Sequence, residues 1–299
     1  MPPTITVRAF AKINLDLQVL GLRPDGYHEL RTTFQSIALS DTITFKKSRG
    51  PFRIECDDPA FPVDRTNLIW KAAERVLRLA RRRDAPSGVT VQVEKNIPMR
   101  SGLGGGSSNA AATLRALCAL WRVPASEAEL HHAAARLGAD VPYFLEGGTT
   151  LGFHRGDLLF PLDDLAPAWV VVVVPDFGIS TKDAFRWWDV ANARQVGQVG
   201  RVGQVGRVGQ VGRRSQRRRT NDLEAVVAKH HPSITKLVRA LTKAGAFHAS
   251  LSGSGSAVFG MFRRRSDAQS AARTLAGPRT FVAPTLSRAA CRRLHLAAK

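Results

Sequence analysis

A glycine-rich segment that runs directly into a helical pattern constrains this chain more than any other feature. Residues 98–109 read Pro-Met-Arg-Ser-Gly-Leu-Gly-Gly-Gly-Ser-Ser-Asn, and apolar residues at helical spacing follow, from Ala111 to Trp121. Glycine permits positive φ and lets a ligand approach the backbone closely. The first N–H groups of a helix are unpaired and lie at the positive end of the helix dipole. The sequence therefore predicts a phosphate site at this loop.

The loop differs from two common phosphate-binding loops. It has no lysine where a Walker A loop requires Gly-Lys-Ser/Thr, and Ser107 stands where a Gly-x-Gly-x-x-Gly fingerprint needs its last glycine. We expect Ser107 or Ser108 to cap the helix with its hydroxyl, which leaves the other hydroxyl for phosphates or a metal. A flexible linker is the alternative, and four glycines packed against a helix start disfavour it.

An alternating segment near the N-terminus predicts a strand that ends in a turn. Apolar residues from Ala11 to Val19 line one face, and the other face carries Lys12 and Asn14. From the pattern alone, that second face is as readily a solvent face as a functional one. The turn Pro-Asp-Gly at 24–26 then presents Tyr27 and His28.

Two further segments carry polar groups at turns. Asp140 lies between Gly-Ala and Val-Pro, after a predicted helix over 126–137, and alone it fits a turn residue as well as a functional carboxylate. Residues 252–256 read Ser-Gly-Ser-Gly-Ser and precede a short apolar strand. A Gly-Ser run is a weak signal by itself, because linkers share this composition.

Taken together, these motifs resemble those of the GHMP kinases, the superfamily of the galactose, homoserine and mevalonate kinases. The loop at 98–109 resembles their central phosphate motif, and residues 252–259 resemble their C-terminal motif. Thr-Asn-Leu-Ile at 66–69 and Asn-Asp-Leu-Glu at 221–224 match two smaller elements. The resemblance spans most of residues 6–285. It implies an α+β fold of two domains, a ribosomal-protein-type N-terminal domain and a ferredoxin-like C-terminal domain, with the active site in the cleft between them.

The resemblance also implies roles for the acceptor side of the site. Ala-Lys-Ile-Asn-Leu followed by Asp-Gly-Tyr-His-Glu-Leu is similar to one branch of the superfamily, which phosphorylates a cytidine diphosphate derivative of methylerythritol on the non-mevalonate route to isoprenoids. By that likeness Asp140 is the catalytic base. Lys12 and Asn14 lie at the reacting hydroxyl, Tyr27 stacks on cytosine, and His28 hydrogen-bonds it. Phe185 is a weaker candidate for a second stacking ring.

The same likeness implies ATP as co-substrate, with Mg²⁺ expected beside it. The sequence does not identify the metal ligands, and Ser108 is a candidate for one of them. The C-terminal loop residues Gly253, Ser254 and Gly255 are expected to close over the phosphates. The residues implied in ATP binding are Asn67, Lys95, Pro98, Met99, Arg100, Ser101, Gly102, Leu103, Gly104, Gly105, Gly106, Ser107, Ser108 and Asn109.

The net charge of the chain narrows the classes of partner that fit it. The formal net charge is +20, which raises nucleic acid as a partner. The basic residues are scattered, and neither zinc-ligand spacing nor a helix-turn-helix pattern accompanies them, so anionic small substrates fit better. A basic RNA-binding module and another GHMP small-molecule kinase remain the alternatives.

Three widely spaced cysteines and no signal peptide at the start of the sequence suggest a cytoplasmic protein. We expect no membrane partner, and a monomer or weak homodimer.

A Val-Gly-Gln/Arg repeat interrupts the second half of the chain. Residues 195–219 contain seven arginines and no acidic residue. Such a segment should repel itself and stay disordered, as an expansion inside a surface loop. The alternative is a polybasic arm that binds an anionic partner.

The sequence divides into an ATP-binding domain at 1–160 and a second domain at 161–299. The apolar run at 168–175 has strand length and predicts a buried central strand.

Two departures from the superfamily pattern stand out: Arg100-Ser101 could change loop flexibility, and Asp16 could add a charge near the acceptor. Predicted strands are 4–20, 31–47, 88–95, 247–251 and 257–262, and predicted helices are 66–82, 107–121, 126–137, 180–190, 222–230, 233–244 and 266–275.

Overall fold

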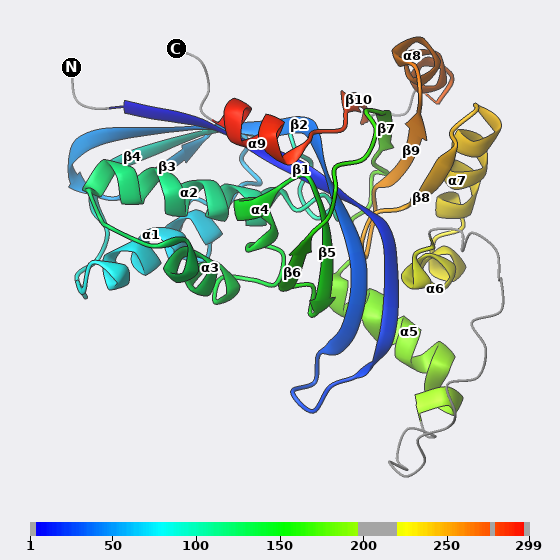
Figure 1. The fold of residues 1–299 in the computed structure, drawn as a ribbon, viewed down its shortest axis with the longest axis horizontal. Coiled ribbons are helices and arrows are strands. Elements are labelled where there is room, and N and C mark those ends of the chain that lie inside the picture. Colours follow the sequence, from blue (N-terminus) through cyan, green and yellow to red (C-terminus); the bar gives the residue numbers. More distant parts are fainter. Residues whose placement is uncertain (1–3, 197–219, 276–278, 296–299) are drawn as a thin grey trace.

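The computed structural model describes residues 4–196, 220–275 and 279–295 (Figure 1). The prediction of a disordered repeat at 195–219 therefore lies outside the described residues, apart from the end of one helix. Within the described ranges the chain forms two β-sheets with helices packed against them.

Six strands form the first sheet in the described part of the chain, in the order β3-β4-β2-β5-β6, with β1 paired to β2. Apolar side chains of this sheet and of helices α1, α2 and α3 share one buried core. These helices lie together along the sheet in Figure 1. The elements are β1 (Thr4–Leu22), β2 (His28–Pro51), β3 (Arg53–Cys56), α1 (Leu68–Leu79), β4 (Ser87–Glu94), α2 (Gly105–Trp121), α3 (Glu127–Ala135), α4 (Tyr143–Glu146), β5 (Thr149–His154) and β6 (Leu158–Pro161).

The second sheet is antiparallel and has the order β10-β7-β9-β8. Its strand β7 lies between two partners, and its valines 170–173 are buried, which confirms the predicted buried strand. The elements are β7 (Trp169–Val173), α5 (Thr181–Val196), α6 (Asp222–His230), α7 (Ser233–Lys243), β8 (His248–Leu251), β9 (Val258–Phe262), α8 (Arg265–Thr274), β10 (Thr280–Pro284) and α9 (Arg288–His295).

The long β1–β2 hairpin joins the two sheets. Ile13 and Leu15 pack with Val170 and Val172 of the second sheet, and further along β1 Leu17 packs with the helices that cover that sheet. The β1–β2 register shifts between Asn14 and Asp16, so the strand bulges there. A bulge bends and twists a strand, and Figure 1 shows the hairpin turning away from the first sheet toward α5.

The polar face of β1 is not a solvent face. Lys12 and Asn14 are 3% and 2% exposed, because both sides of the strand are covered where the sheets meet. Asp16 is also buried and does not line the cleft described below: it accepts hydrogen bonds from the backbone N and the Oγ1 of Thr33. The Asp16 carboxylate, which was expected to add a charge near the acceptor, is therefore bonded to β2 instead.

The strongly periodic elements lie where the sequence predicts them, with ends that differ by a few residues. The elements that the patterns miss are short: β3, β5, β6, β10, α4 and α9 have four to eight residues each. Too few residues repeat in such segments for a period to show.

Candidate active site

A cleft of about 980 Å³ gathers most of the predicted site residues. Its walls come from the β1–β2 hairpin, the glycine loop before α2, the turn that carries Asp140, helix α5 and the 252–256 loop. The predicted residues that line it are Lys12, Asn14, Tyr27, His28, Asn67, Lys95, Pro98, Met99, Arg100, Ser101, Gly102, Gly104, Gly105, Gly106, Ser107, Asp140, Phe185, Gly253 and Ser254.

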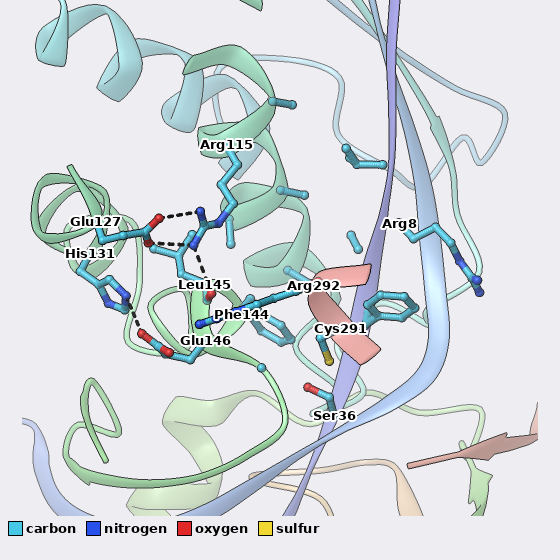
Figure 2. A pocket seen from close by; sticks show the side chains of 18 of the residues that line it. Arg8, Ser36, Arg115, Glu127, His131, Phe144, Leu145, Glu146, Cys291 and Arg292 are labelled. Carbon is cyan, nitrogen blue, oxygen red and sulfur yellow. Dashed lines mark hydrogen bonds and ion pairs between the residues drawn. The ribbon is translucent and has the colours of Figure 1, made fainter. Parts of the chain in front are cut away.

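Four predicted residues do not line the cleft: Leu103, Ser108, Asn109 and Gly255. Leu103 is fully buried, in the core between the sheets. The buried amide of Asn109 makes no hydrogen bond with a described residue. Ser108 lines a second cavity of about 810 Å³ on the other side of α2, where Arg115, Glu127 and Cys291 are found (Figure 2).

The glycine loop starts the helix without a side-chain cap. Gly104 is the N-cap residue, in the left-handed conformation with φ +74°, and α2 begins at Gly105. The prediction of a serine cap is wrong, because Ser107 and Ser108 already lie in the first helical turn. A Cβ at position 104 would approach Phe144 Cζ to 2.5 Å, so only glycine fits. The first N–H groups of α2 are left for a ligand.

The two glycine-rich loops touch through their backbones. Ala257 N donates to Ser101 O at 2.9 Å, and Ser252 Oγ donates to Gly102 O at 3.1 Å. A Cβ on Gly102 would lie 2.3 Å from Ser252 O. The 252–256 loop of the second half thus lies directly against the phosphate loop of the first half.

Lys12 and Asp140 face each other beside these loops. Lys12 Nζ lies 3.4 Å from Asp140 Oδ2, and it donates to Asn14 Oδ1 at 2.5 Å. The Lys12 side chain is 4% exposed and that of Asp140 is 34% exposed. Lys12 N donates to Leu103 O, which fastens β1 to the glycine loop. Because Asp140 is partly open, its carboxylate is accessible to a ligand.

The far end of the cleft is aromatic. Tyr27 is 54% exposed, and the guanidinium of Arg155 lies 5.1 Å above its ring. The His28 ring stacks on Phe185 with centroids 4.6 Å apart. A flat, polar ring is the kind of ligand that such a surface can bind.

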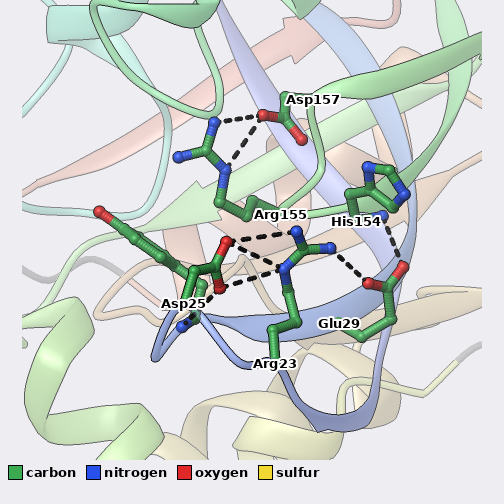
Figure 3. A network of polar contacts seen from close by, with 7 residues as sticks. Arg23, Asp25, Glu29, His154, Arg155 and Asp157 are labelled. Carbon is green, nitrogen blue, oxygen red and sulfur yellow. Dashed lines mark hydrogen bonds and ion pairs between the residues drawn. The ribbon is translucent and has the colours of Figure 1, made fainter.

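Polar contacts hold the hairpin tip that carries Tyr27 and His28 (Figure 3). Arg23 Nη1 pairs with Glu29 Oε2 at 2.7 Å, and Glu29 also accepts from His154 N. Hydrogen bonds from Arg23 lower the pKa of Asp25 below its ordinary value. Asp25 in turn accepts from Tyr27 N. The turn is therefore tied to β2 through Glu29, which is itself bonded to β5 through His154.

Two residues implied in ATP binding already make contacts within the protein. Lys95 Nζ pairs with Asp41 Oδ2 at 2.8 Å, and both side chains are nearly fully buried. Asn67 caps α1: its Oδ1 accepts from Ile69 N at 2.9 Å. Both residues line the cleft. The charge of Lys95, however, is neutralised by Asp41.

Several residues that shape the cleft are not among the predicted site residues. Asn221 Nδ2 donates to Leu251 O and Gly253 O at 2.9 and 2.8 Å, so the Asn-Asp-Leu-Glu motif holds the second glycine loop. Asp189 contacts His28, and Arg155 and Lys182 place positive charge on the cleft wall. No motif marks these last three residues, since only the packing of α5 and β5 brings them to the hairpin.

The described residues hold no group of three or more His, Cys, Asp and Glu side chains that could bind a metal. Asp140 and Ser107 are two of the oxygen-bearing side chains near the glycine loop that line the cleft. Mg²⁺ bound with a nucleotide needs one or two such ligands, because phosphates and water supply the rest. The residues present fit that arrangement.

Among the described residues, no helix is long and apolar enough to cross a membrane.

Comparison with known proteins agrees with this geometry. The GHMP kinases N terminal domain matches residues 67–148, and the GHMP kinases C terminal domain matches residues 198–278. A homoserine kinase structure from Cytophaga hutchinsonii superposes with a TM-score of 0.67 at 19% identity, over 96% of this chain and 98% of that one. The matched family domains and the shared fold therefore identify the chain as a GHMP kinase, and they confirm the predicted fold class.

More similar proteins narrow the class. A 4-diphosphocytidyl-2-C-methyl-D-erythritol kinase from Prosthecochloris aestuarii is 41% identical over 91% of this chain and 94% of its own length. One from Solibacter usitatus is 42% identical over 87% of this chain and 81% of its own length. A crystal structure of 4-(cytidine 5'-diphospho)-2C-methyl-D-erythritol kinase superposes with a TM-score of 0.75 at 30% identity, covering 94% of this chain and 99% of that one. The chain belongs to the family of 4-diphosphocytidyl-2-C-methyl-D-erythritol kinases.

Proposed function

We propose that the cleft transfers the γ-phosphoryl group of ATP to the 2-hydroxyl of 4-diphosphocytidyl-2-C-methyl-D-erythritol, a step of the non-mevalonate route to isoprenoids. One observation supports this most strongly: the Lys12–Asp140 pair lies in the same cleft as the glycine loop and the Tyr27–His28 aromatic end. A phosphate loop, a charged pair and a ring-binding surface are what a transfer from ATP to a nucleotide-linked alcohol needs.

Asp140 and Lys12 carry the proton and charge changes in this proposal. Asp140 accepts or orients the proton of the attacking 2-hydroxyl. The ammonium of Lys12 stabilises the charge that develops during transfer. Asn14 holds Lys12 through its Oδ1 and is itself oriented by Thr32, to whose Oγ1 it donates at 2.8 Å.

The glycine loops hold the donor. Backbone N–H groups at the start of α2 bind the β- and γ-phosphates, and the helix dipole favours their charge. The loop at 253–255 closes on them from the other side. The adenine lies toward Asn67 and the strand end at Lys95. Both side chains are bonded within the protein. They therefore contribute shape and backbone contacts there, and the charge of Lys95 is already paired with Asp41.

The aromatic end holds the acceptor. Tyr27 stacks on the cytosine ring and His28 hydrogen-bonds it. Phe185, the candidate for a second stacking ring, stacks on the His28 ring. Mg²⁺ accompanies ATP, and Ser107 and Asp140 are the side chains that could hold it. When bound, it supplies positive charge that neutralises the phosphates.

The three described cysteines are free, which suits a reducing compartment such as the cytoplasm. We place the domain boundary at residues 160–161, at the end of β6, and we expect a monomer or weak homodimer.

An acceptor panel tests the proposal. Purified protein, ATP and Mg²⁺ are incubated with the diphosphocytidyl acceptor, homoserine, mevalonate or galactose, and ADP formation is measured. The proposal expects turnover with the diphosphocytidyl acceptor alone. Turnover with another acceptor would assign the cleft to a different GHMP reaction.

A further inference from the structure

One face of α5 holds His28 on three sides. Phe185, Trp188 and Asp189 follow the spacing i, i+3, i+4, which places their side chains on the same side of a helix. Phe185 stacks on the His28 ring at an interplanar angle of 18°, and Trp188 meets it edge-on with centroids 5.8 Å apart. Asp189 Oδ1 lies 2.7 Å from His28 Nε2. The ring is thus fixed in both orientation and position.

The chemistry of Asp189 sets the protonation pattern of the ring. An ionised carboxylate only accepts hydrogen bonds, so Nε2 must carry a proton to bond it at this distance. In the neutral imidazole, Nδ1 then has a free lone pair. Nδ1 makes no hydrogen bond with a described residue, and His28 is part of the cleft wall.

We propose that Asp189 is a positioning residue that fixes the Nε2–H tautomer of His28, so that the ring presents an acceptor to the substrate base. Cytosine carries an exocyclic amino group, which donates to such an acceptor. Uracil carries a carbonyl at the same position, which would set one lone pair against another. Asp189 thereby selects a cytosine-bearing acceptor. This inference rests on the proposed function, because it places the base at His28.

The alternative role for Asp189 is purely structural: it fastens α5 to the hairpin tip. Two variants separate the roles. Asp189→Asn keeps the size of the side chain but can donate as well as accept, so it no longer enforces one tautomer. Asp189→Glu keeps the carboxylate. Asp84→Asn is the matched control, because Asp84 is an aspartate of similar exposure in an ion pair with Arg82, outside the cleft.

The first measurement reads the tautomer without any reaction. The ¹⁵N chemical shifts of the His28 ring are recorded for the full chain at pH 8, with the signals assigned by a His28→Gln variant. We expect a protonated Nε2 and an unprotonated Nδ1 in the parent protein and in Asp84→Asn. In Asp189→Asn we expect a mixture of tautomers.

The second measurement reads base selection by binding. Dissociation constants of cytidine 5′-diphosphate and uridine 5′-diphosphate are measured by calorimetry. We expect the parent to prefer the cytidine nucleotide, and Asp189→Asn to lose about tenfold of that preference, the change in equilibrium constant that corresponds to ~1.4 kcal/mol. Asp189→Glu should recover part of it. In turnover assays, KM for the acceptor should rise in Asp189→Asn, while kcat changes little.

Two outcomes would overturn the proposal. An unchanged tautomer in Asp189→Asn would show that the carboxylate does not set it. A changed tautomer with an unchanged nucleotide preference would leave Asp189 a structural contact only. Failure of the proposed function is distinguishable, because it would appear as a lack of phosphoryl transfer in the parent, while both measurements above need no transfer.

Discussion

Lys12 Nζ lies 3.4 Å from Asp140 Oδ2, although 128 positions separate the two residues. Lys12 is buried on β1 and is tied through its backbone to the glycine loop, whereas Asp140 sits on a partly open turn after α3. The pair is thus fixed on the lysine side and accessible on the aspartate side. That asymmetry suits a base that must reach a substrate hydroxyl.

Removing either partner should affect chemistry far more than ATP binding. We expect Asp140→Asn and Lys12→Ala each to lower kcat by about 10²–10⁴-fold, the usual contribution of a positioned acid or base. ATP affinity, measured by calorimetry, should change little, because the glycine loop binds the phosphates. Loss of ATP binding together with turnover would show that the pair has a structural role instead.

Asn221 should matter for the donor side, although it does not line the cleft. Asn221→Ala removes the α6 cap, which costs about 1 kcal/mol, and it frees the two carbonyls that position the second glycine loop. We expect kcat/KM for ATP to fall about tenfold, or ~1.4 kcal/mol in the transition state. Ser126→Ala, which removes the cap of α3, serves as control and should reduce stability without this kinetic loss. Equal kinetics in the two variants would contradict the role assigned to Asn221.

The stability of the protein should fall in alkaline solution partly through Cys118. Burial raises the pKa of this thiol from 9.0 to about 11. The folded state therefore holds the proton more tightly than the unfolded state, and this contribution is complete below pH 9 and lost as pH rises toward 11. The difference in unfolding free energy between the parent and Cys118→Ala, from urea titrations, should shrink across that window. A difference that stays constant from pH 8 to 11 would refute the assignment.

The repeat should be dispensable for catalysis. The cleft residues that the structure describes come from other segments of the chain, and the resemblance to GHMP kinases does not require the repeat. Deleting residues 196–218 should leave kcat and KM for both substrates nearly unchanged in steady-state assays. A large fall in kcat/KM would mean that the repeat belongs to the site.

The local motifs of this chain predict much of the site, because its chemistry lies in short runs such as the glycine loop and the Tyr27–His28 turn. Residues that act through packing were not predictable. Asp189 reaches His28 only because α5 crosses the hairpin tip, and Asp41 neutralises Lys95 across two strands. The prediction of a serine cap for α2 was wrong for a different reason. Gly104 adopts a left-handed conformation, and the helix begins at Gly105, before either serine.

The most direct test of the account is phosphoryl transfer from ATP to 4-diphosphocytidyl-2-C-methyl-D-erythritol, followed by mass spectrometry and ³¹P NMR of the product. The account predicts one ADP per product molecule and a single new phosphate, on the 2-hydroxyl of the acceptor. ATP hydrolysis without a phosphorylated acceptor, or a phosphate on a different hydroxyl, would contradict it.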